Sequence, residues 1–196
     1  MEREEIKGAI EALIFASQQP LKIDKIAEIL SNEEGEDCDR LLVKELLQEI
    51  AEDTEGSGRG ITLSEIAGGY QFRTKTVHAT AVQMLKAKRP PKFGPAAMEV
   101  LSIVAYRQPL TRADIEDLRG VDSGGIVRGL LEKRLIKILG RREVPGKPMI
   151  YGTTKGFLEH FSMRDLSQLP PLKEFVELDE NEKEAAFKRL EQQANK

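Results

Sequence analysis

The chain is poor in the residues from which catalytic and metal sites are usually built. Its 196 residues include one cysteine, two histidines and no tryptophan. Cys38 has no second cysteine with which to form an internal disulfide. One cysteine and two separated histidines, His78 and His160, are too few ligands for a zinc site. Cys38 also lies in an acidic stretch, which raises the pKa of a thiol and disfavours a nucleophile. The sequence therefore predicts a protein that is not an enzyme and uses no cofactor or metal ion.

Long apolar runs are also absent. No run approaches the ~18–20 residues that a membrane-spanning helix needs. The first residues mix charges of both signs and lack the apolar core of a secretory signal. We therefore expect no contact with a membrane and no signal peptide, and the single cysteine suits the reducing cytoplasm.

Two clusters resemble ligand-binding loops but lack the defining residues. Gly56, Gly58 and Gly60 precede an expected strand, whereas a phosphate loop opens a helix and carries Gly-Lys-Ser/Thr. The acidic stretch 33–39 lacks the alternating ligands and the closing glutamate of a calcium loop. We interpret the glycines as turn residues and the acidic stretch as a solvated loop.

Charge is unevenly distributed along the chain. Residues 1–88 carry a net charge of −6, residues 89–164 carry +6 and residues 165–196 carry −3. These differences predict different partners for the different parts.

The first half has the pattern of three helices followed by a β-hairpin. Apolar residues recur at helical spacing over 2–17, 22–30 and 39–52. Alternating runs at 61–66 and 70–74 then flank Gly68-Gly69, which we expect to form the tight turn. A further helix is expected over 76–87. Three helices and a hairpin in this order predict a winged helix-turn-helix.

The same order returns in the second half. A first helix is expected over 95–107. A second, short helix begins at a capping box formed by Thr111 and Asp114 and ends at about Leu118, and a third begins at Ser123. Strands are expected over 135–141 and 148–153 with a turn at 144–147, and Thr153-Thr154 is placed to start a short closing helix.

An internal repeat supports this division. Six residues recur 89 positions later, at equivalent points of the two helix-turn-helix patterns: Ile14, Ala16, Gln19, Pro20, Leu21 and Ile26 return as Ile103, Ala105, Gln108, Pro109, Leu110 and Ile115. A duplication is the natural explanation.

The expected fold class is therefore mostly α with small β-hairpins (α+β), arranged as two tandem winged-helix domains. The domains span 1–88 and 95–165 and are joined by a linker at 89–94, where Pro90-Pro91 stiffens the chain. Residues 166–196 form a charged tail that we expect to be mobile.

A basic surface is the candidate site of the second domain. Its third helix and hairpin carry six cations that could contact nucleic acid or a partner: Arg128, Lys133, Arg134, Arg141, Arg142 and Lys147. Such a surface attracts DNA through counterion release. The alternative is a solvated or protein-binding surface, because this helix begins Ser123-Gly124-Gly125 and is short of groups that read base edges.

The first domain is a poorer candidate for binding DNA. Its third helix carries Glu45, Glu49, Glu52 and Asp53, which phosphate would repel. Its aliphatic residues exceed what so small a domain needs, so they form either one core or a core and a partner-binding face. The sequence leaves both open.

Three separated motifs resemble the segregation and condensation protein B (ScpB) family. They are the early Ile10-Glu11-Ala12-Leu13-Ile14-Phe15-Ala16-Ser17, then Ile103–Arg112, and then Leu139-Gly140-Arg141-Arg142-Glu143-Val144-Pro145-Gly146-Lys147-Pro148 with Tyr151–Thr154 and Phe157-Leu158. Lys147 stands where arginine is commoner in that family. The resemblance covers about residues 5–172.

This resemblance implies two winged helices and a homodimer formed through the N-terminal domains. It also implies binding to the kleisin ScpA, which bridges the heads of SMC ATPases in a complex that condenses and partitions bacterial chromosomes during cell division. The family has no catalytic activity, so we expect a scaffold in the cytoplasm, associated with the nucleoid, that meets DNA indirectly or weakly. The alternative is a dimeric winged-helix transcription regulator.

Overall fold

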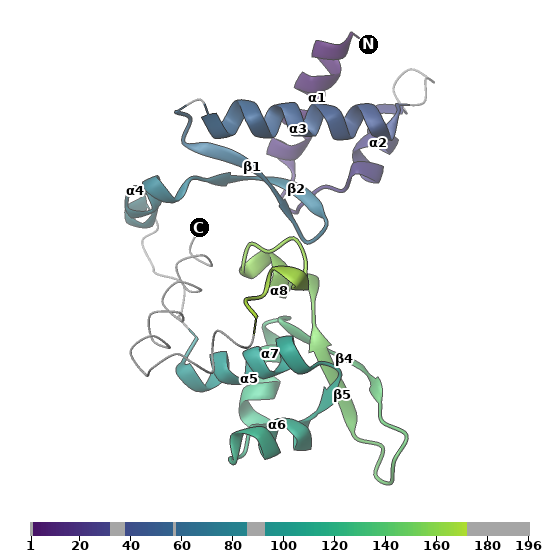
Figure 1. The fold of residues 1–196 in the computed structure, drawn as a ribbon, viewed down its shortest axis with the longest axis vertical. Helices are drawn as coiled ribbons and strands as arrows, with labels where there is room; N and C mark the ends of the chain where they lie inside the picture. Colours follow the sequence, from purple (N-terminus) through teal and green to yellow (C-terminus); the bar gives the residue numbers. More distant parts are fainter. Residues whose placement is uncertain (1, 32–37, 57, 86–92, 172–196) are drawn as a thin grey trace. The chain divides into compact units, whose positions relative to one another are not determined.

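The computed structural model describes residues 2–31, 38–56, 58–85 and 93–171. The chain divides into two compact units, and each is drawn in Figure 1. The first unit takes in Met1–Ala87 and Phe161–Lys196, and the second unit takes in Lys88–His160. The predicted linker lies largely outside the described residues, and so does the part of the predicted tail beyond residue 171.

The first unit begins with three helices, and a two-stranded antiparallel sheet and a short helix follow them. The elements are α1 (Arg3–Ala16), α2 (Ile23–Ser31), α3 (Arg40–Gly56), β1 (Ile61–Ile66), β2 (Gly69–Thr74), a 3-10 turn η1 (Thr76–His78), α4 (Ala79–Leu85) and, after His160, a second 3-10 turn η2 (Leu166–Gln168). The predicted order is confirmed here. The third helix ends four residues later than predicted, and the predicted helix over 76–87 is divided into η1 and α4.

The core of the first unit lies among its three helices and strand β1. Its buried side chains come from the apolar stripes that the helical spacing predicted: Ile10, Ile14, Ile26, Ala27, Val43, Leu46, Leu47, Ile50 and Leu63. Because each helix gives one stripe to this cluster, the opposite faces of the helices remain in solvent.

The hairpin turn differs from the predicted one by a residue. Ile66 pairs with Gly69, so the turn consists of Ala67 and Gly68 with φ of 52° and 73°. Positive φ at both central residues gives a turn whose twist matches the strands. Gly69 is required for a different reason, since a Cβ there would lie 2.9 Å from the carbonyl carbon of Pro20.

A buried threonine protects the outer edge of β1. The Thr54 hydroxyl accepts a hydrogen bond from the Leu63 amide at 3.1 Å and donates to the Ile50 carbonyl oxygen at 2.8 Å. Thr54 is almost fully buried, so this hydroxyl satisfies an edge-strand amide that water does not reach. The bridge therefore joins the end of α3 to the hairpin.

The second unit repeats the arrangement with one additional strand. Its elements are α5 (Pro95–Arg107), β3 (Leu110–Thr111), α6 (Arg112–Arg119), α7 (Gly124–Glu132), β4 (Ile136–Arg141), β5 (Met149–Thr153) and α8 (Lys155–His160). The sheet order is β3-β5-β4, with antiparallel neighbours. The predicted turn is present, because the Lys147 amide donates to the Val144 carbonyl oxygen.

Two predicted helix starts have the expected caps. The Thr111 hydroxyl accepts from the Asp114 amide at 3.2 Å, and the Asp114 carboxylate accepts from the Thr111 amide at 2.7 Å, which confirms the capping box. The Thr154 hydroxyl accepts from the Phe157 amide at 3.1 Å and so caps α8. Local sequence therefore fixes where both helices begin.

The repeat in the sequence is also a repeat in hydrogen bonding. Leu21 pairs with Tyr70 of β2 in the first unit, and Leu110 pairs with Tyr151 of β5 in the second. In each unit the residue after the shared Gln-Pro joins the turn between two helices to the second strand of the hairpin.

The architecture is mixed α and β with small antiparallel sheets, and each unit contains three helices before its hairpin.

Candidate functional site

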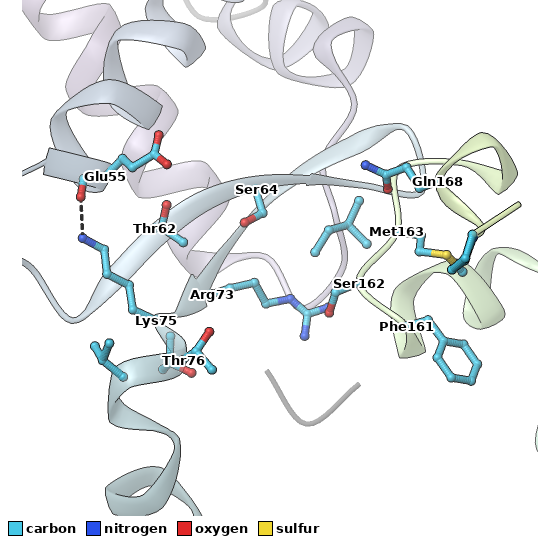
Figure 2. A pocket seen from close by; sticks show the side chains of 14 residues that line it. Glu55, Thr62, Ser64, Arg73, Lys75, Thr76, Phe161, Ser162, Met163 and Gln168 are labelled. Atoms are coloured by element: carbon cyan, nitrogen blue, oxygen red, sulfur yellow. Dashed lines mark hydrogen bonds between the residues drawn. The ribbon is translucent and has the colours of Figure 1, made fainter. Parts of the chain in front are cut away.

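The first unit has a groove along the outer face of its hairpin. The groove has a volume of about 680 Å³, and the hairpin, the start of η1 and the segment after His160 form its walls. Figure 2 shows Thr62 and Ser64 of β1 on the same side as Arg73 of β2, and Phe161, Ser162 and Met163 opposite Thr62. Thr62 and Ser64 face outward because successive residues of a strand point to opposite faces of the sheet, and Leu63 between them points into the core.

The groove combines hydroxyl groups, cations and apolar side chains. Thr62 and Ser64 supply hydroxyls, and Arg73 and Lys75 supply positive charge. The Lys75 ammonium donates to the Glu55 carbonyl oxygen at 2.8 Å, which holds it beside the C-terminal end of α3. Polar, charged and apolar side chains thus line the groove together, a combination that is common in sites that bind other molecules.

Hydrogen bonds hold the opposite wall in place. The Ala67 amide donates to the Met163 carbonyl oxygen at 3.0 Å, which joins this segment to the hairpin turn. The Asp165 carboxylate accepts from the Ser167 hydroxyl and amide and from the Arg164 guanidinium, and these bonds lower the pKa of Asp165 to about 2. The wall is thus a capped, hydrogen-bonded segment.

The first unit also leaves large apolar side chains outside its core. Phe15 of α1 is 81% exposed and Leu41 of α3 is 68% exposed. Val77, Met84 and Leu85, on η1 and α4, are each more than 80% exposed. The aliphatic residues of this unit therefore form a core, and several large apolar side chains remain outside it.

The acidic face of α3 is partly neutralised by α1. Arg3 pairs with Glu49, and the Lys7 ammonium lies 2.8 Å from the Asp53 carboxylate. The hydrogen bonds from Arg3 and Lys7 lower the pKa values of Glu49 and Asp53, respectively. The sequence revealed the acidic residues but not their partners, which lie 46 positions away.

The six basic residues predicted in the second unit fall into two groups. Arg142 is fixed by two hydrogen bonds to the Asp114 carboxylate, at 2.7 and 3.2 Å. Arg141 donates to the Lys147 carbonyl oxygen, and the Lys147 ammonium lies 3.8 Å from Glu143. These three residues therefore stabilise the hairpin and its contact with α6.

The other three basic residues lie at α7 and just after it. Arg128, Lys133 and Arg134 are exposed, and Lys133 lies over the Phe93 ring, 5.6 Å from its centroid. Figure 1 places α7 beside the strands of the second unit. None of these three cations forms an ion pair with a carboxylate of the described residues, and all three side chains are exposed to solvent.

The signature of the hairpin stabilises the fold. The Gln108 side-chain oxygen accepts from the Thr153 amide at 2.8 Å, which connects the Gln-Pro motif to β5. A Cβ on Gly152 would lie 2.6 Å from that same oxygen, so a larger residue there would displace the Gln108 side chain from its hydrogen bond. The motifs that stand apart in the sequence therefore contact one another in the second unit.

The residues considered for catalysis or metal binding are not grouped. His78 is exposed. His160 keeps an exposed edge while its ring packs edge-on against Phe93, and this burial, together with Lys133, lowers the pKa of His160. Burial and then Asp39 raise the pKa of the Cys38 thiol, in the predicted direction. Within the described ranges, no cluster of three metal-ligating side chains is present.

No helix among the described residues combines the length and the apolar character needed to cross a membrane.

The segment that forms the groove wall is the part of the site that sequence reasoning missed. Its residues follow the last strand of the second unit by only a few positions, yet Phe161 onward belongs to the first unit. The only local signal was Asp165 two residues before Ser167, a pattern that commonly caps a short turn.

Large apolar side chains that remain exposed commonly mark surfaces that bind other macromolecules. Comparison with known families makes this specific. The family model for "Segregation and condensation complex subunit ScpB" matches residues 8–172. The chain belongs to this family.

Individual relatives agree. Segregation and condensation protein B of Syntrophotalea carbinolica is 46% identical over 187 residues, which are 95% of this chain and 92% of the relative. The crystal structure of ScpB from Mycobacterium tuberculosis is 31% identical, covers 81% of this chain and 96% of its own, and has a TM-score of 0.40. A dimer of the ScpB N-terminal domain complexed with ScpA peptide is 30% identical, covers 42% of this chain and 95% of its own, and has a TM-score of 0.37.

Proposed function

We propose that the protein is a non-catalytic scaffold subunit of a bacterial SMC complex, which binds the kleisin ScpA as a homodimer and supports chromosome condensation and partition. Membership of the ScpB family carries this proposal. The protein would work in the cytoplasm at the nucleoid, and it would reach the SMC ATPase through the kleisin. Its contribution would be to favour one arrangement of its partners, because a scaffold acts only through differential binding.

Both units are winged helices in this proposal. The support is that each has three helices and an antiparallel hairpin. In each, the residue after the proline between the first two helices also pairs with the second strand of the hairpin. The proposed boundaries are those expected from the sequence, 1–88 and 95–165, except that residues 161–165 group with the first unit.

The groove of the first unit is the proposed site for a segment of ScpA. Its length along β1 and its fixed wall suit an extended or helical segment, and its apolar side chains would provide affinity. Arg73 and Lys75 would select acidic residues of the partner.

Co-purification tests this function. The tagged full chain is recovered from its own cells at moderate salt after nuclease treatment, and an SMC ATPase and a kleisin are expected with it. Recovery of neither, together with one defined DNA fragment when nuclease is omitted, would contradict the proposal and favour the transcription regulator.

A variant that fills the groove sharpens the test. Ser64→Trp should strongly reduce recovery of the kleisin, because an indole would occupy space that the segment needs. Glu28→Trp adds the same side chain to an exposed position of α2 and should leave recovery unchanged. Equal recovery with both variants would place the kleisin site elsewhere.

The basic residues of the second unit support a second, weaker contact. Arg128, Lys133 and Arg134 would approach DNA phosphates without reading sequence, since α7 begins with two glycines. A regulator would instead bind one duplex much more tightly than random DNA.

A further inference from the structure

The groove of the first unit brings positive charge together in an acidic part of the chain. Residues 1–88 carry a net charge of −6, yet the groove is lined by two cations, Arg73 and Lys75, and by one acidic residue, Glu55. The Lys75 ammonium donates to the backbone carbonyl oxygen of Glu55, a contact that leaves its charge in place. A segment that binds in this groove should therefore carry negative charge.

The described part of the chain ends at the groove itself. Pro170 is one of the lining residues, and residue 171 is the last one described. The groove follows β1, whose six residues span about 20 Å at roughly 3.3 Å per residue. The chain from residue 172 to residue 180 can span up to about 30 Å when extended. The residues that follow the groove wall are therefore able to reach along the whole groove.

The sequence that follows has a composition complementary to the groove. Residues 174–180 read Glu-Phe-Val-Glu-Leu-Asp-Glu, so four acidic and three apolar residues give a net charge of −4. Residues 181–196 differ, because their three acidic and four basic residues give a net charge of +1. The complementary charge is thus concentrated in 174–180, which is called the acidic segment below.

The apolar residues of the acidic segment also have a counterpart in the groove. Val77 lines the groove and is 82% exposed, and Pro170 beside it is half-buried. The basic surface of α7 offers charge alone, since no large apolar side chain of that helix is exposed. A segment with both acidic and apolar residues therefore suits the groove better than it suits α7.

The short connection between the groove and the acidic segment favours their contact. Binding between two parts of one chain is intramolecular, and a short tether gives an effective concentration in the millimolar range. A contact too weak to hold two separate molecules together would therefore still fill the groove.

We propose that the acidic segment docks in the groove of the first unit of the same chain, with its carboxylates toward Arg73 and Lys75. The consequence for binding rests on the proposed function: a kleisin segment that uses this groove must first displace the acidic segment. The chain would thus carry its own competitor, and the apparent affinity for the kleisin would fall with the fraction of grooves that are open.

A nitroxide label beside the acidic segment tests the docking without any partner. The label is attached at Asn181→Cys in a full chain that also carries Cys38→Ser, and amide signals are observed by nuclear magnetic resonance. The amides of β1, and those of Ser162 and Met163 on the opposite wall, should lose most of their intensity. Neutralising the acidic segment, with Glu174→Gln, Glu177→Gln, Asp179→Asn and Glu180→Gln together, should restore these signals, because the attraction to Arg73 and Lys75 is removed.

A matched control neutralises the same number and kind of residues elsewhere in the first unit. The exposed residues of this control are Asp24, Glu28, Glu45 and Glu52, replaced by Asn or Gln. The loss of signal at β1 should persist in this variant. If it disappeared in both variants, total charge and not the acidic segment would be responsible, and the proposal would be overturned.

Calorimetric titration with the purified kleisin ScpA measures the competition. The chain with the neutralised acidic segment should bind the kleisin about tenfold more tightly than the unchanged chain, because its groove is open. The matched control should bind like the unchanged chain.

The outcomes distinguish this inference from the proposed function. No loss of signal at β1, or loss at α7 in its place, overturns the docking and leaves the proposed function standing. Loss at β1 that persists after neutralisation overturns recognition by charge. Docking that responds to neutralisation, with equal kleisin affinity in all three chains, supports the inference and places the kleisin site outside the groove.

Discussion

Gly152 shows how close packing of side chains, with no unusual backbone angle, can favour glycine. A Cβ there would lie 2.6 Å from the Gln108 side-chain oxygen and 2.7 Å from a Leu139 methyl carbon. We expect Gly152→Ala to destabilise the second unit by about 1–3 kcal/mol, because the Gln108 and Leu139 side chains must shift to admit the methyl group, and the hydrogen bond from the Thr153 amide to Gln108 would be disturbed. Hydrogen exchange of peptides spanning β3 and β5, followed by mass spectrometry, measures this.

Gly129 provides the matched control. It lies within α7, and a Cβ there would have no neighbouring atom within 4 Å. Gly129→Ala should therefore slow exchange and stabilise the unit by up to about 1 kcal/mol through helix propensity. If the two variants changed exchange equally, the crowding at Gly152 would not be the cause.

Single residues were predictable where their partners are near in sequence. The capping box of Thr111 and Asp114 spans three positions, so its letters identify it. Thr54 could not be assigned a role, because its partner Leu63 lies nine positions away across a turn. The hairpin turn was placed one residue late, since Ala67 adopts the positive φ that the sequence favoured for Gly69.

Between elements, the pairing of Arg142 with Asp114 joins the hairpin to the start of α6. The Thr111 amide and then the Arg142 guanidinium lower the pKa of Asp114. A carboxylate whose pKa is lower in the folded state stabilises the fold above its unfolded pKa of about 3.9 and stops doing so as the pH falls through the folded pKa. The contribution of Asp114 should therefore be complete at neutral pH and disappear in acid.

Asp114→Asn tests this expectation. At pH 7 the variant should be less stable by about 0.5–2 kcal/mol, the usual range for a lost helix cap. The difference from the unchanged chain should shrink as the pH falls below about 4, because the carboxyl group is then neutral in both states. Urea unfolding across this pH range measures the difference.

The neighbouring Asp117 is the control for Asp114. It is exposed on the same helix, so Asp117→Asn should change stability by less than about 0.5 kcal/mol at any of these pH values. A similar pH dependence in both variants would mean that general charge, and not the contact with Arg142, is responsible.

The bounds of the helices were predicted better than the contacts that each helix makes with the rest of the chain. Helical spacing and capping residues located α5 to the residue and the other helices to within a few positions. The same spacing placed Val77, Met84 and Leu85 on one further helix, but it could not indicate that they lie outside the core. Amphipathic patterns show which residues avoid water, and only the packing shows whether the same chain supplies the cover.

At the scale of the whole molecule, the groove was beyond the reach of the sequence. It needs the hairpin and the segment after His160 to meet, and about 90 positions separate them along the chain. The regional charge balance was visible from the letters, whereas the structure was needed to separate the basic residues that stabilise the fold from those that remain available. Arg142 belongs to the first kind, and Arg128 and Arg134 belong to the second.

The available cations of the second unit should give the protein a weak affinity for DNA. The full chain should bind random duplex with an affinity that falls as salt rises, because the binding would come from released counterions. Replacing Arg128, Lys133 and Arg134 with glutamine should reduce the slope of log affinity against log salt by roughly 0.9 for each phosphate that the variant no longer neutralises. Fluorescence anisotropy with a labelled duplex at several salt concentrations measures this slope.

The control removes the same number of charges from the first unit. Lys22, Lys25 and Lys44 are exposed there, and their replacement by glutamine should leave the slope unchanged if the DNA is bound by α7 and the residues just after it. An equal reduction of the slope in both triple variants would indicate that only total charge matters. A strong preference of the unchanged chain for one duplex, abolished in the α7 variant, would instead identify this surface as a sequence reader, because phosphate contacts alone cannot distinguish sequences.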